Sequence, residues 1–135
     1  MIKVKYSVYL LKSTVCNRTY IGYTNGDVKI RLKKHNESAT LGAKRTRRHR
    51  PWEIILYVTG FEFEKTALQY EYMAQHPPKR LRKRGNNGIA NKIKIMKSLL
   101  RQEKICSTAP LNSELKLVIF FLKPEAYKLW NSFLV

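Results

Sequence analysis

The sequence predicts an α/β (α+β) fold in which a small central antiparallel sheet of about three strands is flanked by helices. Residues 4–11, 18–24 and 52–58 are rich in β-branched and aromatic side chains, as strands are. A short turn around Asn17 separates the first two segments, which pairs them as an antiparallel hairpin. The segments between and after the strands place apolar residues at helical spacing.

The first helix is expected directly after the hairpin. Asn25-Gly26 is a strong turn signal, and Asp27 has a side chain suited to capping a helix N-terminus. Over residues 28–35 the apolar positions recur with a helical period. Residues 38–50 are small, basic and polar, and we expect them to form a mobile loop over the binding face.

A buried strand and a second helix are expected after this loop. Residues 52–58 are almost continuously apolar, which predicts a central position in the sheet. A helix is expected over 62–75, and Pro77-Pro78 ends it. Four residues of this helix form one apolar stripe: Phe63, Ala67, Tyr70 and Ala74.

The C-terminal part is expected to add a basic amphipathic helix over 89–104, a strand over 115–122 and a short helix over 124–130. No internal repeat or low-complexity linker divides the chain. We therefore expect one compact unit, in which residues 1–88 form the core domain and residues 89–135 form an extension packed on it.

Positive charge is concentrated in two blocks. The chain of 135 residues has 27 Lys and Arg against nine Asp and Glu, a formal net charge of +18. Residues 29–50 and 79–104 carry +17 of this charge between them. A concentrated positive field attracts polyanions through counterion release. The composition therefore favours a nucleic-acid partner over a membrane surface.

Other classes of protein fit the composition poorly. No apolar run approaches the roughly 20 residues that a membrane span needs, and the N-terminus lacks the apolar region of a signal peptide. Cys16 and Cys106 are two thiols, too few for a cysteine-rich zinc module or a secreted disulfide framework. We therefore expect an intracellular protein with no membrane partner.

Four side chains suit the hydrolysis of a phosphodiester. Such a reaction needs a group that orients water, positive charge on the phosphorane and stabilisation of the leaving oxygen. Glu71 on the second helix is a candidate ligand for a divalent metal, because Mg²⁺ needs only one or two protein carboxylates. The pattern alone equally allows Glu71 at a solvated helix rim, Tyr9 and Tyr20 as packing residues, and Arg31 on an exposed helix face.

The order of these residues resembles the GIY-YIG nuclease superfamily. The matching segments include Ser7-Val8-Tyr9, Tyr20-Ile21-Gly22, Arg31-Leu32-Lys33-Lys34-His35-Asn36, Arg50-Pro51-Trp52-Glu53, and Ala67-Leu68-Gln69-Tyr70-Glu71 with Gln75-His76-Pro77. The segment after the glutamate is similar to the eukaryotic Slx-type branch of structure-specific endonucleases. The resemblance covers about residues 5–125. Ser7 stands where the family triplet has glycine.

The resemblance implies a GIY-YIG nuclease-like fold and a role for each site residue. Tyr9 would be the general base or orient the water, and Tyr20 would assist at the same pocket. Arg31 would stabilise the phosphorane, and His35 would support the phosphate or the tyrosine network. Glu71 would hold a single divalent metal, Mg²⁺ or Mn²⁺.

The implied activity is metal-dependent hydrolysis of branched DNA such as flaps, forks and Holliday junctions, in repair or recombination. The basic residues expected to contact the DNA are Lys33, Lys34, Lys44, Arg45, Arg47, Arg48, Arg50, Lys79, Arg80, Arg82, Lys83 and Arg84. The Slx-type branch also carries a cysteine-rich zinc domain that docks a scaffold subunit, and the sequence to Val135 lacks one. The sequence therefore leaves open whether the chain acts with a scaffold subunit, with another partner or alone. The sequence resembles a minimal, viral version of the branch, and a eukaryotic source would place it in the nucleus.

Two other functions fit parts of the sequence. A non-catalytic basic nucleic-acid-binding protein explains the charge equally well. A sequence-specific homing or restriction enzyme of the same superfamily would share the catalytic residues. A zinc site built from His35, His49 and His76 fits poorly, because their spacing matches no compact metal motif.

Overall fold

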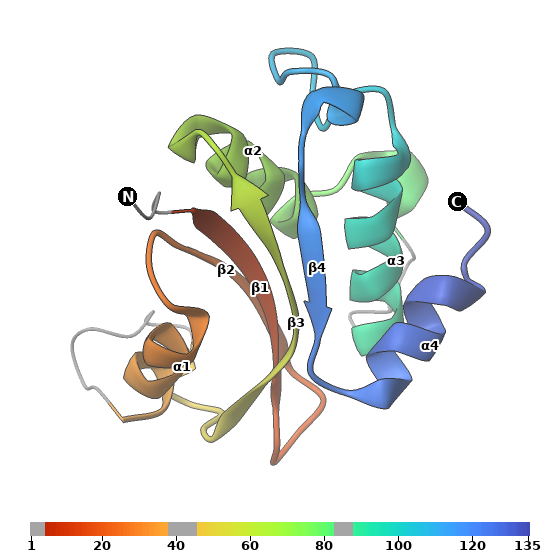
Figure 1. Cartoon of the computed structure of the whole chain (residues 1–135). Helices are drawn as coiled ribbons and strands as arrows, with labels where there is room; N and C mark the ends of the chain where they lie inside the picture. Colours follow the sequence, from red (N-terminus) through yellow and green to blue (C-terminus); the bar gives the residue numbers. More distant parts are fainter. Residues whose placement is uncertain (1–4, 38–45, 83–87) are drawn as a thin grey trace.

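The computed structural model describes residues 5–37, 46–82 and 88–135. Its centre is an antiparallel sheet of four strands in the order β2-β1-β3-β4 (Figure 1). The strands are β1 (Tyr6–Ser13), β2 (Thr19–Thr24), β3 (Trp52–Phe61) and β4 (Val118–Phe121). The α-helices are α1 (Val28–Glu37), α2 (Glu64–Gln75), α3 (Ile89–Arg101) and α4 (Pro124–Ser132). Two short 3₁₀ helices, η2 (Lys79–Leu81) and η3 (Asn112–Glu114), complete the described elements.

The sheet confirms the predicted hairpin and the central position of β3. β1 and β2 pair so that Tyr9 lies opposite Gly22, and β3 lies between β1 and β4. The sheet has four strands where the sequence predicts about three. The fourth strand, β4, confirms the strand predicted within 115–122 and joins the sheet by pairing with β3, so Thr59 lies opposite Val118.

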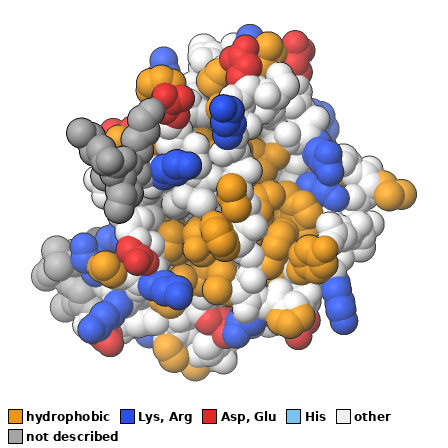
Figure 2. Space-filling model, viewed as in Figure 1, with side chains coloured by type: hydrophobic (Ala, Val, Ile, Leu, Met, Phe, Trp, Pro, Cys, Tyr) orange, Lys and Arg blue, Asp and Glu red, His pale blue; other side chains and the backbone are white. Residues whose placement is uncertain are grey.

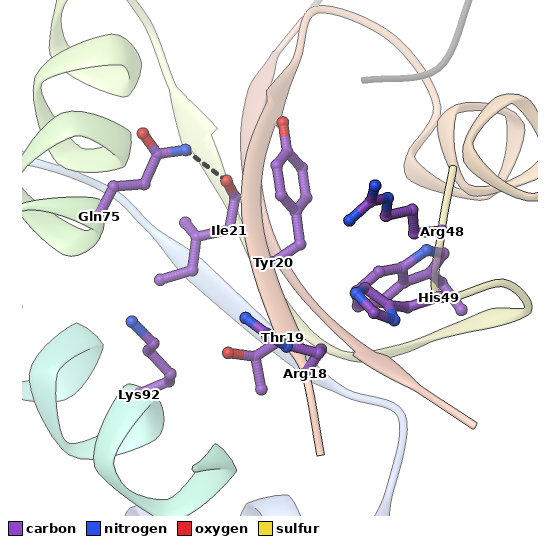
Figure 3. Close-up of a pocket in the computed structure, with 9 residues that line it drawn as sticks. Arg18, Thr19, Tyr20, Ile21, Arg48, His49, Gln75 and Lys92 are labelled. Atoms are coloured by element: carbon purple, nitrogen blue, oxygen red, sulfur yellow. Dashed lines mark hydrogen bonds between the residues drawn. The ribbon is translucent and has the colours of Figure 1, made fainter. Parts of the chain in front are cut away.

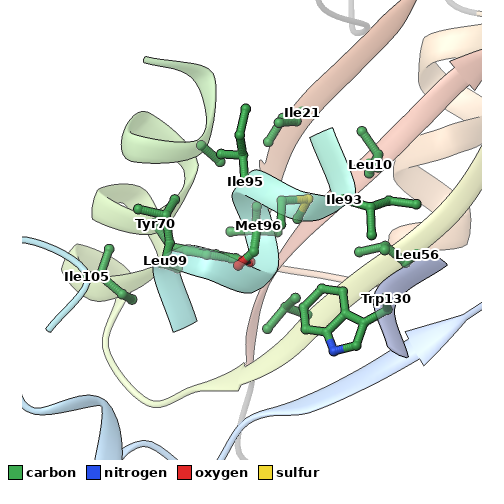
Figure 4. Packing of buried hydrophobic residues seen from close by; sticks show 14 of the residues in the cluster. Leu10, Ile21, Leu56, Tyr70, Ile93, Ile95, Met96, Leu99, Ile105 and Trp130 are labelled. Carbon is green, nitrogen blue, oxygen red and sulfur yellow. Dashed lines mark hydrogen bonds between the residues drawn. The ribbon is translucent and has the colours of Figure 1, made fainter. Parts of the chain in front are cut away.

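Two hydrophobic clusters lie on opposite faces of the sheet. The larger one joins Leu10 and Leu56 of the sheet to α2, α3 and α4, and Met96 of α3 is fully buried in it (Figure 4). The smaller cluster lies under α1 and contains Tyr9 and Trp52. Figure 1 shows the resulting layers, with α1 on one side of the sheet and the other helices on the opposite side.

The apolar stripe predicted for α2 is wrong at its first residue. Ala67, Tyr70 and Ala74 are buried as expected. The helix begins at Glu64, however, and Phe63 precedes it with 64% of its surface exposed. An extended residue before the first turn does not share the helical period, so its side chain leaves the stripe.

β3 extends beyond its predicted end to Gly60 and Phe61. Gly60 has a φ of 103°, a backbone conformation that residues with a Cβ rarely adopt. A Cβ there would also lie 2.6 Å from the backbone oxygen of Lys116. Glycine at this position therefore allows the segment before β4 to pass close to β3.

One face of the molecule carries exposed apolar side chains around β4. Val118 and Phe120 alternate with the less exposed Ile119 and Phe121, as expected for a strand with one covered face. The Phe120 ring stacks on Tyr57 of β3 with 5.0 Å between the ring centroids. Figure 2 shows hydrophobic side chains gathered on this face. Among the described helices, none is long and apolar enough to cross a membrane.

Lys97 joins α3 to the end of α4 inside the larger cluster. Only 5% of its surface is exposed, and its ammonium donates hydrogen bonds to the backbone oxygens of Trp130 and Phe133, at 2.7 and 2.8 Å. Carbonyl groups at the end of a helix lack partners within the helix, and a cation there satisfies them. Lys97 thus stabilises the contact between α3 and α4 and is not part of the exposed basic surface.

Replacing Lys97 by methionine is expected to destabilise the protein. Lys97→Met keeps an unbranched side chain of similar length but removes the ammonium that donates to the Trp130 and Phe133 carbonyl groups, at a cost of about 2 kcal/mol. Urea unfolding followed by circular dichroism measures the change. Lys128→Met, at an exposed position on α4, is the matched control and should change the stability little. Equal stability of the two variants would contradict the assigned role of Lys97.

Candidate active site

Residues from both faces of the sheet meet at the free edge of β2. Tyr9 and Tyr20 lie on the face covered by α1, which supplies Arg31 and His35. α2 covers the other face and packs against β2, and its residue Glu71 interacts electrostatically with both Tyr9 and Arg31. The structure therefore brings Tyr9, Tyr20, Arg31 and His35 into direct contact, and it places Glu71 near enough to interact electrostatically with Tyr9 and Arg31.

A buried chain of hydrogen bonds connects β1 to α1 and to the segment before β3. The Tyr9 hydroxyl lies 2.7 Å from Nε2 of His35, and Nδ1 of His35 lies 2.8 Å from Oγ1 of Thr46. His35 and Thr46 are fully buried, and Tyr9 is 1% exposed. The rings of Tyr20 and His35 also pack together, with 5.2 Å between their centroids.

The surroundings of His35 keep its imidazole neutral. Burial lowers its pKa from 6.5 to about 4, and the charges of Arg31 and Arg50 act in the same direction. Arg50 also donates a hydrogen bond from Nε to the backbone oxygen of His35. A neutral imidazole has one donor and one acceptor nitrogen. The network then assigns Nε2 as the acceptor for Tyr9 and Nδ1–H as the donor to Thr46.

Arg31 and Glu71 place opposite charges beside the tyrosines. Nε of Arg31 donates to the Tyr9 hydroxyl over 3.4 Å. Burial raises the pKa of Glu71, and the nearby Arg31 charge opposes that shift. Burial also raises the pKa of Tyr9, with the Glu71 charge contributing in the same direction. Glu71 is half-buried, so its carboxylate is partly shielded yet reachable.

Gly22 leaves the space that the two phenol rings occupy. A Cβ at this position would lie 2.5 Å from Cζ of Tyr9 and 2.7 Å from Cε1 of Tyr20. Real Cβ atoms do not approach other atoms so closely, so any larger residue would displace both rings. Ser7, where the family triplet has glycine, is buried and donates a hydrogen bond to Oγ1 of Thr59 over 2.8 Å.

Local contacts fix α1 and its two site residues against the sheet. Asp27 caps the helix as predicted, because its carboxylate accepts a hydrogen bond from the Lys29 amide at 2.7 Å. Asn36 at the other end exchanges two hydrogen bonds with the Trp52 backbone, at 2.6 and 3.0 Å. Nε1 of Trp52 in turn donates to the Thr46 backbone oxygen at 2.6 Å.

A cavity of about 450 Å³ opens beside Tyr20, which is the one candidate catalytic residue among its described lining residues, and it is here called the active-site cavity. Figure 3 shows Tyr20 on β2 between Gln75 of α2 and the residues Arg48 and His49 before β3. Gln75 donates a hydrogen bond to the Ile21 backbone oxygen at 2.5 Å. The cavity lining is basic, and it comprises Arg18, Thr19, Tyr20, Ile21, Arg48, His49, Trp52, Gln75 and Lys92.

The predicted DNA-binding residues separate into several groups. Arg48 lines the active-site cavity, and Lys33, Lys34, Arg47, Lys79, Arg80 and Arg82 are exposed elsewhere. Lys33 also lies 4.0 Å from Glu37 on the same helix. Arg50 is half-buried against His35 and supports α1. Lys44, Arg45, Lys83 and Arg84 lie outside the described residues, as does the segment 38–45 of the expected mobile loop.

The sequence interpretation missed several residues of the site. Thr46 was expected in a surface loop but is fully buried under His35. Arg18 and Lys92 line the active-site cavity although neither was predicted to bind DNA. Arg18 could have been found, because residues two apart on a strand share a face and Arg18 precedes Tyr20 by two. Lys92 carries no such signal, since only the packing of α3 brings it to the cavity, where burial lowers its pKa.

The residues present could hold a metal ion through one carboxylate. Among the described residues, no group of three or more His, Cys, Asp and Glu side chains lies close enough to bind a metal. Glu71 alone suits Mg²⁺ or Mn²⁺, which can keep several waters and bind substrate phosphates beside a single carboxylate.

Comparisons with known proteins agree with this arrangement. The GIY-YIG catalytic domain matches residues 5–80. The structure-specific endonuclease subunit SLX1 of Cryptococcus neoformans is 36% identical over 141 residues, covering 94% of this chain and 28% of the relative. The slx1 subunit of Aspergillus terreus is 35% identical over 137 residues, covering 96% and 35%. The slx1 subunit of Penicillium rubens is 48% identical over 79 residues, covering 56% and 19%. The chain thus spans about a third or less of the length of these relatives.

Because His35 is buried and neutral, we expect acid to destabilise the protein over a defined range of pH. The folded state holds His35 at a pKa of about 4, whereas the unfolded chain returns it to 6.5. Between these values the unfolded state binds more protons, so stability should fall as the pH is lowered from about 6.5 to 4. Thermal unfolding at pH 7 and pH 5 measures the loss.

Two controls isolate the contribution of His35. His35→Gln should lose less stability than the original protein between pH 7 and pH 5, whereas His76→Gln, at an exposed histidine, should show the original pH dependence. NMR titration follows the His35 ring directly. A ring that titrates near pH 6.5 in the folded protein would contradict the buried neutral state.

Proposed function

The chain belongs to the GIY-YIG family, and on that premise we propose that it is a metal-dependent DNA endonuclease that hydrolyses phosphodiester bonds in branched DNA. Flaps, forks and Holliday junctions arising in repair or recombination are the substrates. The observation that carries the proposal is the cluster of two phenols, a guanidinium and a half-buried carboxylate, in which Tyr20 also lines a basic cavity. The names of the relatives, structure-specific endonuclease subunits, support the choice of branched DNA.

Glu71 is the residue that would hold a divalent metal, Mg²⁺ or Mn²⁺. A bound metal would supply positive charge to the phosphate oxygens and promote ionisation of a coordinated water. The raised pKa of Glu71 results from burial in the free protein. Bringing a cation beside it would favour the ionised carboxylate and reverse that shift.

We assign different roles to the two tyrosines of the site. Tyr20 lines the active-site cavity, so we assign it the contact with the attacking water. Tyr9 is buried, and its raised pKa keeps it protonated at neutral pH. It therefore orients its neighbours: its hydroxyl accepts from Arg31 and donates to His35. His35 is fully buried, so of its two expected roles the support of the tyrosine network is the one that the geometry favours.

Arg31 supplies the charge that stabilises the phosphorane. Its Nε is engaged by Tyr9, which fixes the plane of the guanidinium. A planar guanidinium presents several donors to phosphate oxygens in a fixed geometry. Electrostatic groups fixed in advance are effective because they need no reorganisation when the charge develops.

Basic residues around the cavity would bind the DNA backbone. Arg18, Arg48 and Lys92 line it, and the exposed Lys33 and Lys34 extend the positive surface along α1. We assign catalysis to a core of residues 1–88 and an accessory role in binding to residues 89–135. Lys92 of α3 supports that accessory role because it reaches the cavity.

The names of the relatives suggest a partner subunit, and the proposed substrate suggests a cellular location. The relatives are named as subunits, so we propose that a scaffold protein assists this chain as well. A DNA-cutting enzyme acts where DNA is repaired, which is inside the cell and in the nucleus of a eukaryote. Affinity capture with the tagged chain, performed beside the cleavage assay, tests for a required partner.

A non-catalytic nucleic-acid-binding protein is the alternative from another class. Such a protein uses exposed cations and has no need of a half-buried carboxylate beside Arg31. A sequence-specific enzyme of the same family would share the site, and only its substrate preference would differ. Cleavage assays on branched and linear DNA distinguish the three functions.

Glu71→Gln is expected to abolish cleavage and to leave DNA binding nearly intact. The amide removes the charge that would hold the metal, and losing several kcal/mol of charge stabilisation lowers the rate by roughly 10³-fold. Labelled flap, Holliday-junction and linear duplex DNA are incubated with the protein in Mg²⁺ or in chelator. Exposed Glu125 on α4 gives the control variant Glu125→Gln, which should cut normally. Binding of all substrates without Mg²⁺-dependent cutting by the original protein or its partner complex would refute the proposal.

Gly22→Ala is expected to reduce cleavage strongly, because its methyl group displaces both phenol rings. A misplacement of about 1 Å at a reacting centre can cost roughly 10²-fold in rate. Gly26→Ala is the matched control, because a Cβ there meets nothing within 4 Å. Cleavage rates and circular dichroism are compared for both variants. Full activity of a folded Gly22→Ala protein would show that the ring positions are unimportant.

A further inference from the structure

A second basic cavity lies on α3 outside the candidate active site. It has a volume of about 310 Å³ and lies between η2, α3 and Phe133, which follows α4. We call it the α3 pocket. Three of the residues that line it are cationic: Arg80, Arg82 and Lys94.

Among the residues that the structure describes, the positive charge of the α3 pocket has no anionic partner. No carboxylate lines it, and within residues 5–37, 46–82 and 88–135 neither arginine nor Lys94 forms an ion pair. Arg80 donates to the amide oxygen of Gln102, and Nε of Arg82 donates to the Pro77 backbone oxygen at 2.8 Å. Neutral acceptors orient the guanidinium groups without neutralising them. An anion is therefore the ligand that this pocket suits.

A buried hydroxyl at the same pocket also lacks a partner. Ser98 lines the pocket, is 6% exposed, and its Oγ forms no hydrogen bond in the described part of the chain. Buried polar atoms are almost always satisfied, so an unsatisfied one calls for an explanation. The oxygen of a bound phosphate accepts hydrogen bonds from hydroxyl, guanidinium and ammonium groups alike.

α3 separates the α3 pocket from the active-site cavity. Asn91, Lys94 and Ser98 recur at helical spacing on one side of the helix, and Lys92, about 100° around the helix from Asn91, lines the active-site cavity. An α-helix with its side chains is about 10–12 Å across. DNA held in the active-site cavity can therefore present a second phosphate to the α3 pocket within a short distance.

We propose that the α3 pocket binds a backbone phosphate of the DNA substrate away from the cut, on the arm that leaves the branch. This inference rests on the proposed function and adds to it a contact that branched DNA makes and a short linear duplex does not. Each cation in contact with a phosphate contributes about one released counterion. The pocket would thus raise the affinity for branched over linear DNA.

The test compares two triple variants that remove the same charge. The pocket variant is Arg80→Ala, Arg82→Ala and Lys94→Ala, and the control is Lys65→Ala, Lys116→Ala and Lys128→Ala at exposed positions outside both cavities. Binding of a labelled flap and of a short linear duplex is measured in chelator at several salt concentrations. We expect the pocket variant to lose about tenfold in flap affinity per phosphate contact near 0.1 M salt, with a shallower salt dependence. The pocket variant should lose less affinity for the linear duplex than for the flap. The control variant should lose little affinity for either DNA, and by the same factor for both.

A second measurement locates the phosphate directly. Inorganic phosphate is added at constant ionic strength, and amide NMR signals of Lys94 and Ser98 are followed in the original protein and in Ser98→Ala. We expect those signals to shift, and Ser98→Ala to weaken the effect several-fold. Unchanged signals, or equal losses by pocket variant and control on both DNAs, would overturn the inference. Shifts with inorganic phosphate but normal flap binding by the pocket variant would overturn it too, because they indicate a site for free anions.

The inference and the proposed function fail in different ways. Cleavage by the original protein in Mg²⁺ tests the proposed function and does not involve the α3 pocket variants. If the original protein binds branched DNA and does not cut it, the nuclease proposal fails while the binding comparison still decides the role of the pocket.

Discussion

The buried chain from Tyr9 through His35 to Thr46 is the interaction on which the site depends. It joins a central strand, the first helix and the segment before β3 through two hydrogen bonds of 2.7 and 2.8 Å. Because all three residues are buried, a lost partner would leave an unsatisfied polar group. The neutral imidazole fixes the Tyr9 hydroxyl, and that hydroxyl in turn accepts a hydrogen bond from Arg31.

The second constraint is electrostatic. Glu71 brings a carboxylate to a surface where cations dominate, and it does so from the opposite face of the sheet to the tyrosines. Only a free sheet edge permits this approach, and β2 provides it. Gly22 on that strand keeps the space between the phenols clear. The open edge, the glycine and the carboxylate are the features on which the proposed site for a phosphate and a cation rests.

The basic residues of the chain serve different purposes according to their burial. Lys97 is buried and satisfies the last carbonyl groups of α4, and Arg50 supports α1 through the His35 backbone. Arg48 and Lys92 face the active-site cavity, whereas Arg80, Arg82 and Lys94 line the α3 pocket. The net charge of +18 therefore includes buried residues that stabilise the fold and residues that line the two cavities. Charge density alone does not distinguish them, because burial and hydrogen-bond partners are properties of the fold.

The sequence by itself determined the local elements and the family. Alternation of apolar residues and the Asn25-Gly26 turn predicted the hairpin, and Asp27 predicted the start of α1, because these signals act over a few residues. The order of Tyr9, Tyr20, Arg31 and Glu71 identified the family. Only the tertiary structure decided that Thr46 is buried, that Phe63 leaves its stripe and that Lys92 reaches the active-site cavity. Those outcomes depend on contacts between segments distant in the chain, which no local pattern encodes.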